Sequence, residues 1–224
     1  MTAIIFDSET TGLKDPQMVE GAYLKLGSIQ FLDVTEEFLQ RYKPSKPIEL
    51  GALATSHIYD EELVDCPPHT DFALPDGTTY IIGHNVDYDW GVIGQPDVKR
   101  ICTQALSRAL WPDADSHSQS AMIYLHYREF ARGLLQNAHA ALDDVLNCRR
   151  LLVKILEEIA LRNGAAVFSF EDLWMISEEA RVPTVMRSGK FKGTKVSEIP
   201  GWHRKWLLEQ PGTDPYLIKA LLAN

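Results

Sequence analysis

Residues 4–13 read IIFDSETTGL, an apolar run followed by two carboxylates and a Thr-Thr-Gly turn. In an extended strand, side chains two positions apart share a face, so Asp7 and Glu9 point the same way. If Ile4 and Phe6 share a face, Ile5 occupies the other, which makes both faces apolar before the acids begin. The stretch therefore predicts a buried central strand whose last turn carries two negative charges.

The two carboxylates of this strand need a compensating interaction. At a separation of about 4 Å they repel each other by roughly 4 kcal/mol at an effective dielectric constant near 20. A divalent cation is the simplest compensation. An Asp-x-Glu at a solvated strand end is the alternative, and this stretch alone leaves both interpretations open.

Composition indicates an ordinary globular protein with one sizeable core. The chain has 224 residues, of which 45% are apolar and 24% charged, and these fractions are typical of soluble domains. No apolar run is long enough to cross a bilayer, and the first residues do not resemble a secretory signal. The three cysteines Cys66, Cys102 and Cys148 are odd in number and widely spaced. They fit neither a disulfide framework nor a zinc site, and favour a cytoplasmic location.

Charge is unevenly distributed along the chain. The net charge of −9 argues against a protein that coats nucleic acid nonspecifically. Residues 181–224, however, contain eight basic and three acidic side chains, whereas the preceding 180 residues contain 14 basic and 28 acidic ones. An acid-lined metal site with a phosphate-gripping extension would produce this pattern, although chance also produces it in a short tail.

The order of predicted elements indicates an α/β fold with a mixed five-stranded sheet and helices on its faces. Strands are expected near residues 4–9, 19–32, 36–42, 78–82 and 100–103. Helices are expected at 48–60, after Gly83, and at 104–110, 120–130 and 143–163. The last of them is amphipathic, is stopped by Gly164, and has on its apolar side Leu146, Leu151, Leu152, Ile155, Ile159 and Leu161. The sequence character changes near residues 163–170, so we expect a main domain over 1–163 and a small extension over 164–224.

Further polar side chains stand where a metal site would need them. Asp89 lies in the first turn of a helix that follows a strand, a usual place for ligands in an open α/β sheet. His139 and Asp144 bracket the start of the long helix, with Asp143 beside Asp144. Together with Asp7 and Glu9 they offer four carboxylates and one imidazole, which suits Mg²⁺ or Mn²⁺ better than zinc.

Three segments, in this order, resemble the DEDDh subgroup of 3′→5′ exonucleases. They are DSETTGL at 7–13, HNVDYD at 84–89 and HAALDD at 139–144. The resemblance covers roughly residues 2–160. Ser8 stands where threonine is more usual, residues 19–22 follow the family pattern loosely, and Asp87 and Asp143 add acids beside the family's ligand positions. Asp144 is preferred over Asp143 because the family has a five-residue interval after the histidine.

The resemblance implies an RNase H-like fold and a set of site residues. Asp7, Glu9, Asp89 and Asp144 would hold two Mg²⁺ or Mn²⁺ ions that clamp the scissile phosphate. His139 would take the proton of the attacking water. The turn of Thr10, Thr11, Gly12 and Leu13 would lie against the terminal nucleotide, and His84 and Asn85 would position substrate or the adjacent helix.

The implied function is a 3′→5′ exonuclease that releases nucleoside 5′-monophosphates from single- or double-stranded DNA ends in repair. An RNA-trimming enzyme or a polymerase proofreading subunit is the alternative within the class. A catalytically silent nucleic-acid-binding module is the alternative from another class, and the complete set of five residues speaks against it. Protein partners cannot be predicted.

The basic tail carries a candidate nucleic-acid contact of its own. Lys190 and Lys192 flank Phe191 in the segment SGKFKG at 188–193. Two cations beside an aromatic ring could bind a phosphodiester backbone and a base. A solvated turn of a small domain accounts for the same residues equally well.

Overall fold

A mixed five-stranded sheet in the order β3-β2-β1-β4-β5 forms the centre of the computed structural model, which describes residues 2–223. The strands are β1 (Thr2–Thr10), β2 (Met18–Leu26), β3 (Val34–Arg41), β4 (Thr78–Gly83) and β5 (Lys99–Cys102). The first three form an antiparallel meander, whereas β4 and β5 run parallel to β1. The predicted α/β class and the mixed five-stranded sheet are confirmed.

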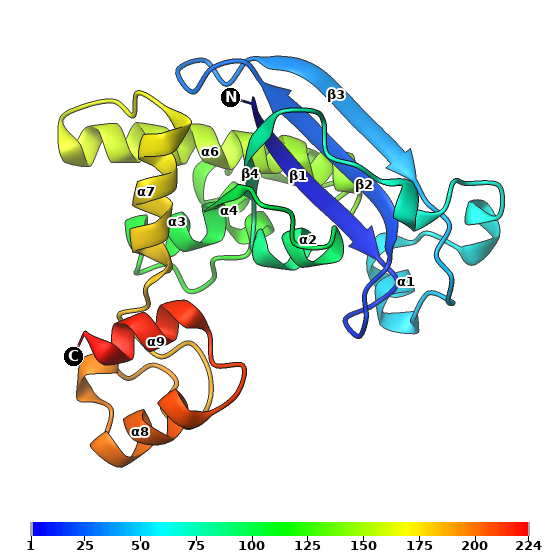
Figure 1. The fold of residues 1–224 in the computed structure, drawn as a ribbon. Coiled ribbons are helices and arrows are strands. Elements are labelled where there is room, and N and C mark those ends of the chain that lie inside the picture. Colours follow the sequence, from blue (N-terminus) through cyan, green and yellow to red (C-terminus); the bar gives the residue numbers. More distant parts are fainter. Residues whose placement is uncertain (1, 224) are drawn as a thin grey trace.

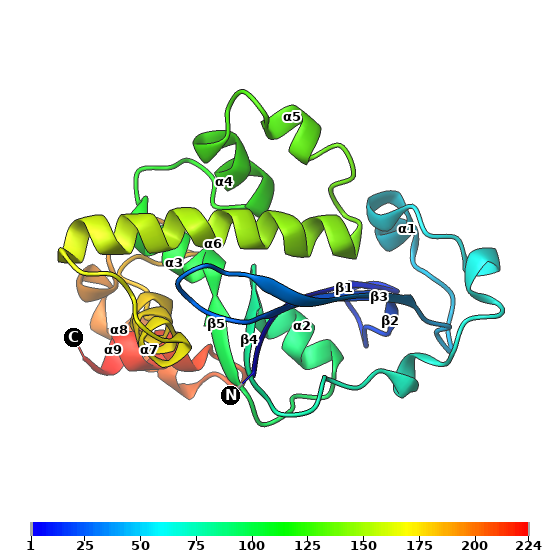
Figure 2. The ribbon, with the colours of Figure 1, turned by 90° about the horizontal axis from the view of Figure 1, so that it is seen from above.

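Helices cover both faces of this sheet. They are α1 (Leu50–Ser56), α2 (Asp87–Val92), α3 (Thr103–Leu110), α4 (Gln119–His126), α5 (Ala131–Leu134), α6 (Ala141–Asn163), α7 (Phe170–Arg181), α8 (Gly201–Glu209) and α9 (Pro215–Leu222), with short 3₁₀ turns at Asp60–Leu63, His69–Asp71 and Val196–Glu198. Figure 2 shows α6 along one face with α4 and α5 outside it, and α2 on the opposite face. Across residues 2–223, no helix combines the length and the apolar character that crossing a membrane requires.

The side-chain alternation of β1 decides where its acids point. Ala3 and Ile5 belong to the core cluster that packs against α6, whereas Ile4 and Phe6 belong to the cluster on the other face. All four are almost completely buried, so the prediction of a buried central strand is confirmed. Because alternate residues share a face, the next odd-numbered side chains of β1, which are its two acids, point toward the α6 side.

The segment after β2 departs from the sequence expectation. The predicted strand over 19–32 ends at Leu26, and a tight turn follows. Asp33 closes this turn by accepting hydrogen bonds from the Ser28 amide at 3.1 Å and from its hydroxyl at 2.8 Å. Phe31 is left 82% exposed on the turn. The β-forming residues near position 30 were therefore a misleading indication, because a short polar turn connects β2 to β3.

Helix α6 also differs in detail from its prediction. It begins at Ala141, two residues before the expected start, and ends at Asn163, followed by Gly164, whose φ of 67° provides the left-handed C-cap. Leu151, Leu152 and Ile155 are fully buried on its inner face, but Leu161 is 78% exposed, so its prediction on the buried side was wrong. Leu161 lies in the last turn of the helix, and this end of α6 extends beyond the sheet (Figure 2). The helix predicted over 120–130 is shorter than expected, because it ends at His126.

The C-terminal residues form a second, smaller hydrophobic cluster. Helix α7 still packs against α3 and β5, and its Leu173 is part of the main core. Beyond it, a separate cluster contains Met186, Val196, Ile199, Ala220 and Leu221. Figure 1 shows this part, with α8 and α9, as a lobe set apart from the sheet. The division at residues 163 and 164 stays a prediction.

Two leucines of α6 allow a matched test of where the core lies. Leu151→Ala removes a fully buried side chain and should lower the free energy of unfolding by about 3 kcal/mol through lost burial and a residual cavity. Leu161→Ala, at an exposed position of the same helix, should change it by less than about 0.5 kcal/mol. Urea denaturation of both variants measures the difference. Equal effects would contradict the packing of α6 described here.

Candidate active site

Four carboxylates from three elements meet at the carboxyl end of β1. Asp7 and Glu9 come from β1, Asp89 from the first turns of α2, and Asp144 from the first turn of α6. The charges of Asp89, Asp144 and Glu9 all act on the Asp7 carboxyl. The structure therefore brings together all four acids that the sequence singled out as metal ligands.

Asp89 is held in place by the residue between the two acids of β1. It is 4% exposed, and its Oδ1 accepts hydrogen bonds from the Ser8 amide at 3.0 Å and the Ser8 hydroxyl at 2.7 Å. A buried carboxylate needs such partners because it has lost its water. The serine that stands at the family's usual threonine position retains the hydroxyl group that this contact requires.

Asp144 is fixed by groups on both sides of it. The Gln119 side-chain amide donates to Oδ1 at 3.1 Å, and the backbone N–H of His139 donates to Oδ2 at 3.2 Å. His139 adopts a left-handed conformation with φ of 72°, which is uncommon for a residue other than glycine. Glu9, His139 and Asp144 each offer one ligand atom within 4.8 Å of the others. These three residues could hold a metal ion.

Mutual repulsion and burial make the metal-free cluster electrostatically costly. Burial, and then the neighbouring carboxylates Asp89 and Asp144, raise the pKa of Asp7 well above its usual 3.8. Burial and the charges of Asp144 and Glu20 raise the pKa of Glu9 to about 8. Burial raises the pKa of Asp89 to about 7 although its bonds to Ser8 oppose this, and burial also raises the pKa of Asp144. An oxygen-rich cluster with one imidazole fits a divalent cation that would neutralise it.

Glu20 is a further acid of the site that the sequence motifs did not select. It pairs with Glu9 across the β1–β2 ladder and is 6% exposed. Its carboxylate accepts from the Ala141 amide at 3.2 Å and lies 3.0 Å from Nε of Arg41. Glu20 thus connects β2 to the first residue of α6, three residues before Asp144. The loose family pattern at residues 19–22 was the only indication of it.

A cavity of about 420 Å³ lies beside Glu9, between the end of β1 and α1. Glu9, Thr10, Gly12 and Leu13 line one side of it, and α1 lines the other through Gly51, Ala52 and Thr55. The residues from α1 had no recognisable motif. Leu13 is 86% exposed at the rim, where an apolar side chain can contact a bound molecule.

Tyr88 is a second residue that the sequence motifs missed. Its hydroxyl oxygen lies 2.6 Å from Oγ1 of Thr10 and donates to the Gly12 carbonyl at 3.1 Å. These two contacts of the Tyr88 hydroxyl group hold in place the turn after β1 that lines the cavity. Tyr88 lies directly before Asp89, so α2 provides both a metal-ligand candidate and a support for the cavity wall.

The remaining predicted substrate contacts lie in different surroundings. Thr11 is fully buried, and its hydroxyl oxygen accepts a hydrogen bond from the backbone N–H of Gln17 at 3.2 Å. His84 uses both ring nitrogens within the protein, one 3.1 Å from Oγ1 of Thr103 and the other 2.9 Å from the His117 carbonyl. Burial lowers the pKa of His84 to about 4. Asn85 is exposed with φ of 70°, immediately before α2.

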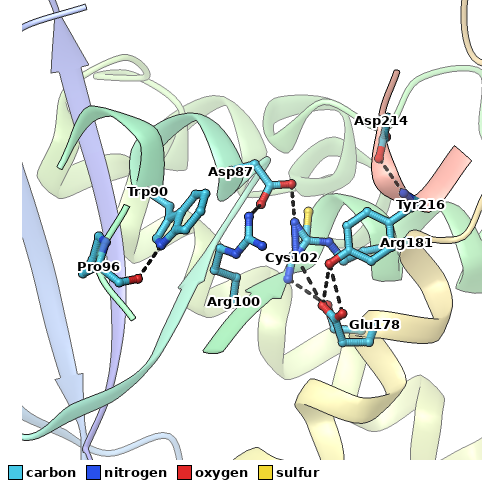
Figure 3. Close-up of polar contacts among 10 residues, drawn as sticks. Asp87, Trp90, Pro96, Arg100, Cys102, Glu178, Arg181, Asp214 and Tyr216 are labelled. Carbon is cyan, nitrogen blue, oxygen red and sulfur yellow. Dashed lines mark hydrogen bonds and ion pairs between the residues drawn. The ribbon is translucent and has the colours of Figure 1, made fainter. Parts of the chain in front are cut away.

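Asp87, the other acid of this segment, lies away from the cluster. Its carboxylate forms ion pairs with Arg100 of β5 and Arg181 at the end of α7 (Figure 3). The guanidinium of Arg181 also lies 4.6 Å from the ring centroid of Tyr216 in α9, and the Tyr216 hydroxyl donates to Glu178 at 2.8 Å. Asp87 therefore connects α2 to the C-terminal lobe, while Asp89 on the same helix faces the acids.

The known proteins to which this chain is similar are exonucleases. No family model matches the chain. It is 26% identical over 211 residues to exodeoxyribonuclease 10 of Escherichia coli (strain K12), covering 91% of this chain and 89% of that protein. The structure of exonuclease X in complex with 5′ overhanging duplex DNA superposes with a TM-score of 0.61 and 26% identity, covering 78% of this chain and 99% of that one.

A more distant neighbour shares the fold alone. Escherichia coli exonuclease I in complex with a dT13 oligonucleotide superposes with a TM-score of 0.55 and 21% identity, over 73% of this chain and 42% of that one. The two preceding similarities confirm the resemblance to DEDDh exonucleases that the sequence motifs predicted, and this third one agrees with the predicted RNase H-like fold.

The raised carboxyl pKa values predict how the stability of the metal-free protein depends on pH. A carboxyl group with a higher pKa in the folded state binds its proton more tightly there, so stability falls as pH rises from the unfolded to the folded pKa. For the pKa of Glu9 this interval runs from 4.5 to about 8, and for that of Asp89 from 3.8 to about 7. We expect the melting temperature in a chelating buffer to fall across this range.

A charge-removing variant provides the control for this titration. Asp7→Asn keeps the shape of the side chain but removes one charge, so the decline in melting temperature with pH should be smaller. Saturating Mn²⁺ should raise the melting temperature of the unmodified protein at the upper end of the range by binding only the folded state. A melting temperature that rises with pH in the chelating buffer would contradict the clustered-acid geometry.

Proposed function

We propose that this chain, which is similar to exodeoxyribonuclease 10, is a metal-dependent 3′→5′ exodeoxyribonuclease that releases nucleoside 5′-monophosphates from DNA 3′ ends. The convergence of four acids from β1, α2 and α6 beside a cavity large enough for a nucleotide carries this proposal. The names of the relatives, an exodeoxyribonuclease and an exonuclease bound to duplex DNA, support DNA as the substrate.

The acid cluster is suited to Mg²⁺ or Mn²⁺, and we propose that two such ions are held by Asp7, Glu9, Asp89 and Asp144. Carboxylate oxygens are the preferred ligands of these cations. Bound ions would activate a water, neutralise the scissile phosphate and stabilise the leaving oxygen. Glu20 lies behind this set and contributes through the placement of α6.

His139 is the candidate general base. Its side chain is exposed, and a nitrogen of its ring lies within 4.8 Å of ligand atoms of Glu9 and Asp144. An imidazole at this edge of the cluster can accept a proton from the attacking water and pass it to solvent. The bond from its backbone N–H to Asp144 holds the residue beside the acids.

We propose that the cavity beside Glu9 receives the terminal nucleotide. Thr10, Gly12 and Leu13 would contact it from β1 and the following turn, with exposed Leu13 against the base. Tyr88 would hold this turn through its bonds to Thr10 and Gly12. Thr11 and His84, whose polar atoms already have partners in the protein, would act by positioning these elements.

The wider setting of the activity follows from the same proposal. We assign it to DNA repair, and to the cytoplasm because the three cysteines are free thiols. The C-terminal residues Lys190, Phe191 and Lys192 are proposed to contact nucleic acid, since Lys190 and Lys192 are exposed on a turn of the basic lobe. RNA trimming and proofreading remain the alternatives within the class.

End-labelled substrates test the polarity and the substrate directly. With DNA labelled at its 5′ end, Mg²⁺ should produce a ladder that shortens progressively from the 3′ end, and a chelator should abolish it. Matched RNA should be degraded more slowly. Faster degradation of RNA would support the RNA-trimming alternative, and loss of intact label without a ladder would point to cleavage from the other end.

Substitutions in α6 and in the loop before it test the residue assignments. Asp144→Asn should reduce kcat to near the detection limit because it removes a ligand charge, whereas Asp143→Asn should remain close to the unmodified enzyme. His139→Ala should lower kcat by roughly 10²–10⁴-fold, the usual contribution of a general base. Gel assays at saturating Mg²⁺ measure all three. A severe loss for Asp143→Asn with little loss for Asp144→Asn would reverse the assignment of the two acids.

A further inference from the structure

The C-terminal lobe carries a cluster of aromatic rings built on one turn and one helix. Phe191 lies on a turn between Met186 and Thr194, whose backbones are joined by a hydrogen bond of 2.9 Å. Its ring centroid is 6.1 Å from that of Trp202 and 4.7 Å from that of His203 in α8. The His203 ring in turn stacks on Trp206 at 5.2 Å and 15°. The buried His203 ring thus links all three aromatic side chains.

The two tryptophans of α8 are the exposed members of this cluster. Trp202 and Trp206 are 62% and 49% exposed, and a spacing of four residues puts them on the same side of the helix. The remaining tryptophans, Trp90, Trp111 and Trp174, are all half-buried and lie outside this lobe. Exposing two large indole rings on one helix face is unfavourable unless a ligand covers them.

Positive charge surrounds these rings. Lys190 places its Nζ 5.2 Å from the ring centroid of Trp202 and 5.7 Å from that of Phe191. From residue 186 to residue 206 the chain contains six basic side chains and one acidic one, Glu198. An apolar protein partner would gain little binding energy from so many positive charges around the rings. A polyanion whose aromatic bases can stack on the indole rings matches both the charge and the exposed ring faces.

We propose that Trp202 and Trp206, together with Lys190, form a stacking platform for an unpaired stretch of nucleic acid. The bases would stack on the indole rings while the ammonium group contacts the phosphodiester backbone. Base pairing hides base faces within a duplex, so the platform would select single-stranded segments. This inference deepens the proposed function, on which it rests, by naming a second binding site and the form of the strand that it takes.

The lobe that carries the platform is fixed to the catalytic domain by a polar network. Arg181 at the end of α7 joins Asp87 of α2 to Tyr216 of α9, and Asp214 caps α9 through the Tyr216 amide at 2.8 Å (Figure 3). The same helix α2 carries Asp89 of the acid cluster. A strand held by the platform is therefore tethered to the domain that hydrolyses its end, which raises the effective concentration of that end at the active site.

Direct binding measurements on the full chain test the platform. The probe is a long fluorescent oligodeoxythymidine in a chelating buffer, which prevents cleavage. Trp202→Ala and Trp206→Ala should each weaken binding by roughly tenfold, the usual contribution of one stacked base. Lys190→Ala should reduce the slope of log affinity against log salt by about 0.7, the value for one phosphate contact on a single strand. Melting temperatures of the variants should match that of the unmodified protein.

Two controls separate base stacking on the platform from a general loss of affinity. Phe31→Ala removes an aromatic ring that is even more exposed, on the β2–β3 turn, and should leave oligodeoxythymidine affinity unchanged. Blunt duplex DNA should bind the tryptophan variants as well as it binds the unmodified chain. Equal losses for duplex and single strand would overturn the selection of unpaired bases. Unchanged affinity of a double Trp202→Ala, Trp206→Ala variant would overturn the platform and favour a protein contact on these rings.

Turnover measured separately distinguishes failure of this inference from failure of the proposed function. A chain that degrades DNA but binds oligodeoxythymidine equally well with and without the two tryptophans retains the exonuclease assignment and loses the platform. A chain that binds through the tryptophans but degrades neither DNA nor RNA in Mg²⁺ retains the platform and loses the exonuclease assignment.

Discussion

Electrostatic repulsion among four clustered and at least partly buried carboxylates is the constraint on which the rest of the site depends. Asp7, Glu9, Asp89 and Asp144 are brought together by elements that are far apart in the sequence, and burial and mutual repulsion raise their pKa values. Folding of the metal-free protein has to overcome this cost. The apolar side chains of β1 on both faces, and the long buried face of α6, supply the burial that does so. A divalent cation that binds only the folded site would stabilise it, and such an ion would also assist the proposed hydrolysis.

The supporting residues show how the acids keep their places. Ser8 binds Asp89, Gln119 and the His139 amide bind Asp144, and Glu20 connects β2 to the start of α6. The contacts of Ser8, Gln119 and Glu20 each join two elements of secondary structure, and the His139 amide joins α6 to the loop before it. The two acids of α2 have different partners. Asp89 lies beside the other carboxylates, whereas Asp87 pairs with Arg100 and with Arg181, which lies at the end of α7 beside the C-terminal lobe.

The sequence was sufficient for those features that have a fixed spacing. Alternation in β1 placed Asp7 and Glu9 on one face, the resemblance to DEDDh exonucleases selected Asp144 over Asp143, and the order of strands and helices indicated the mixed sheet. Features that depend on distant contacts were missed. Glu20, Tyr88 and the α1 wall of the cavity are recognisable only after β2, α2 and α1 have been placed around β1. Leu161 and the turn after β2 were misassigned because local patterns do not reveal where the sheet ends.

Binding of cations between β1 and the start of α6 is the central requirement of the proposed function. Anomalous diffraction from crystals soaked in Mn²⁺ locates such ions without reference to activity. We expect anomalous peaks within bonding distance of carboxylate oxygens of Glu9, Asp144 and their neighbours, and their loss in an Asp7→Ala variant. If saturating Mn²⁺ gave peaks only elsewhere on the surface and none beside these carboxylates, a metal-dependent nuclease site would be contradicted.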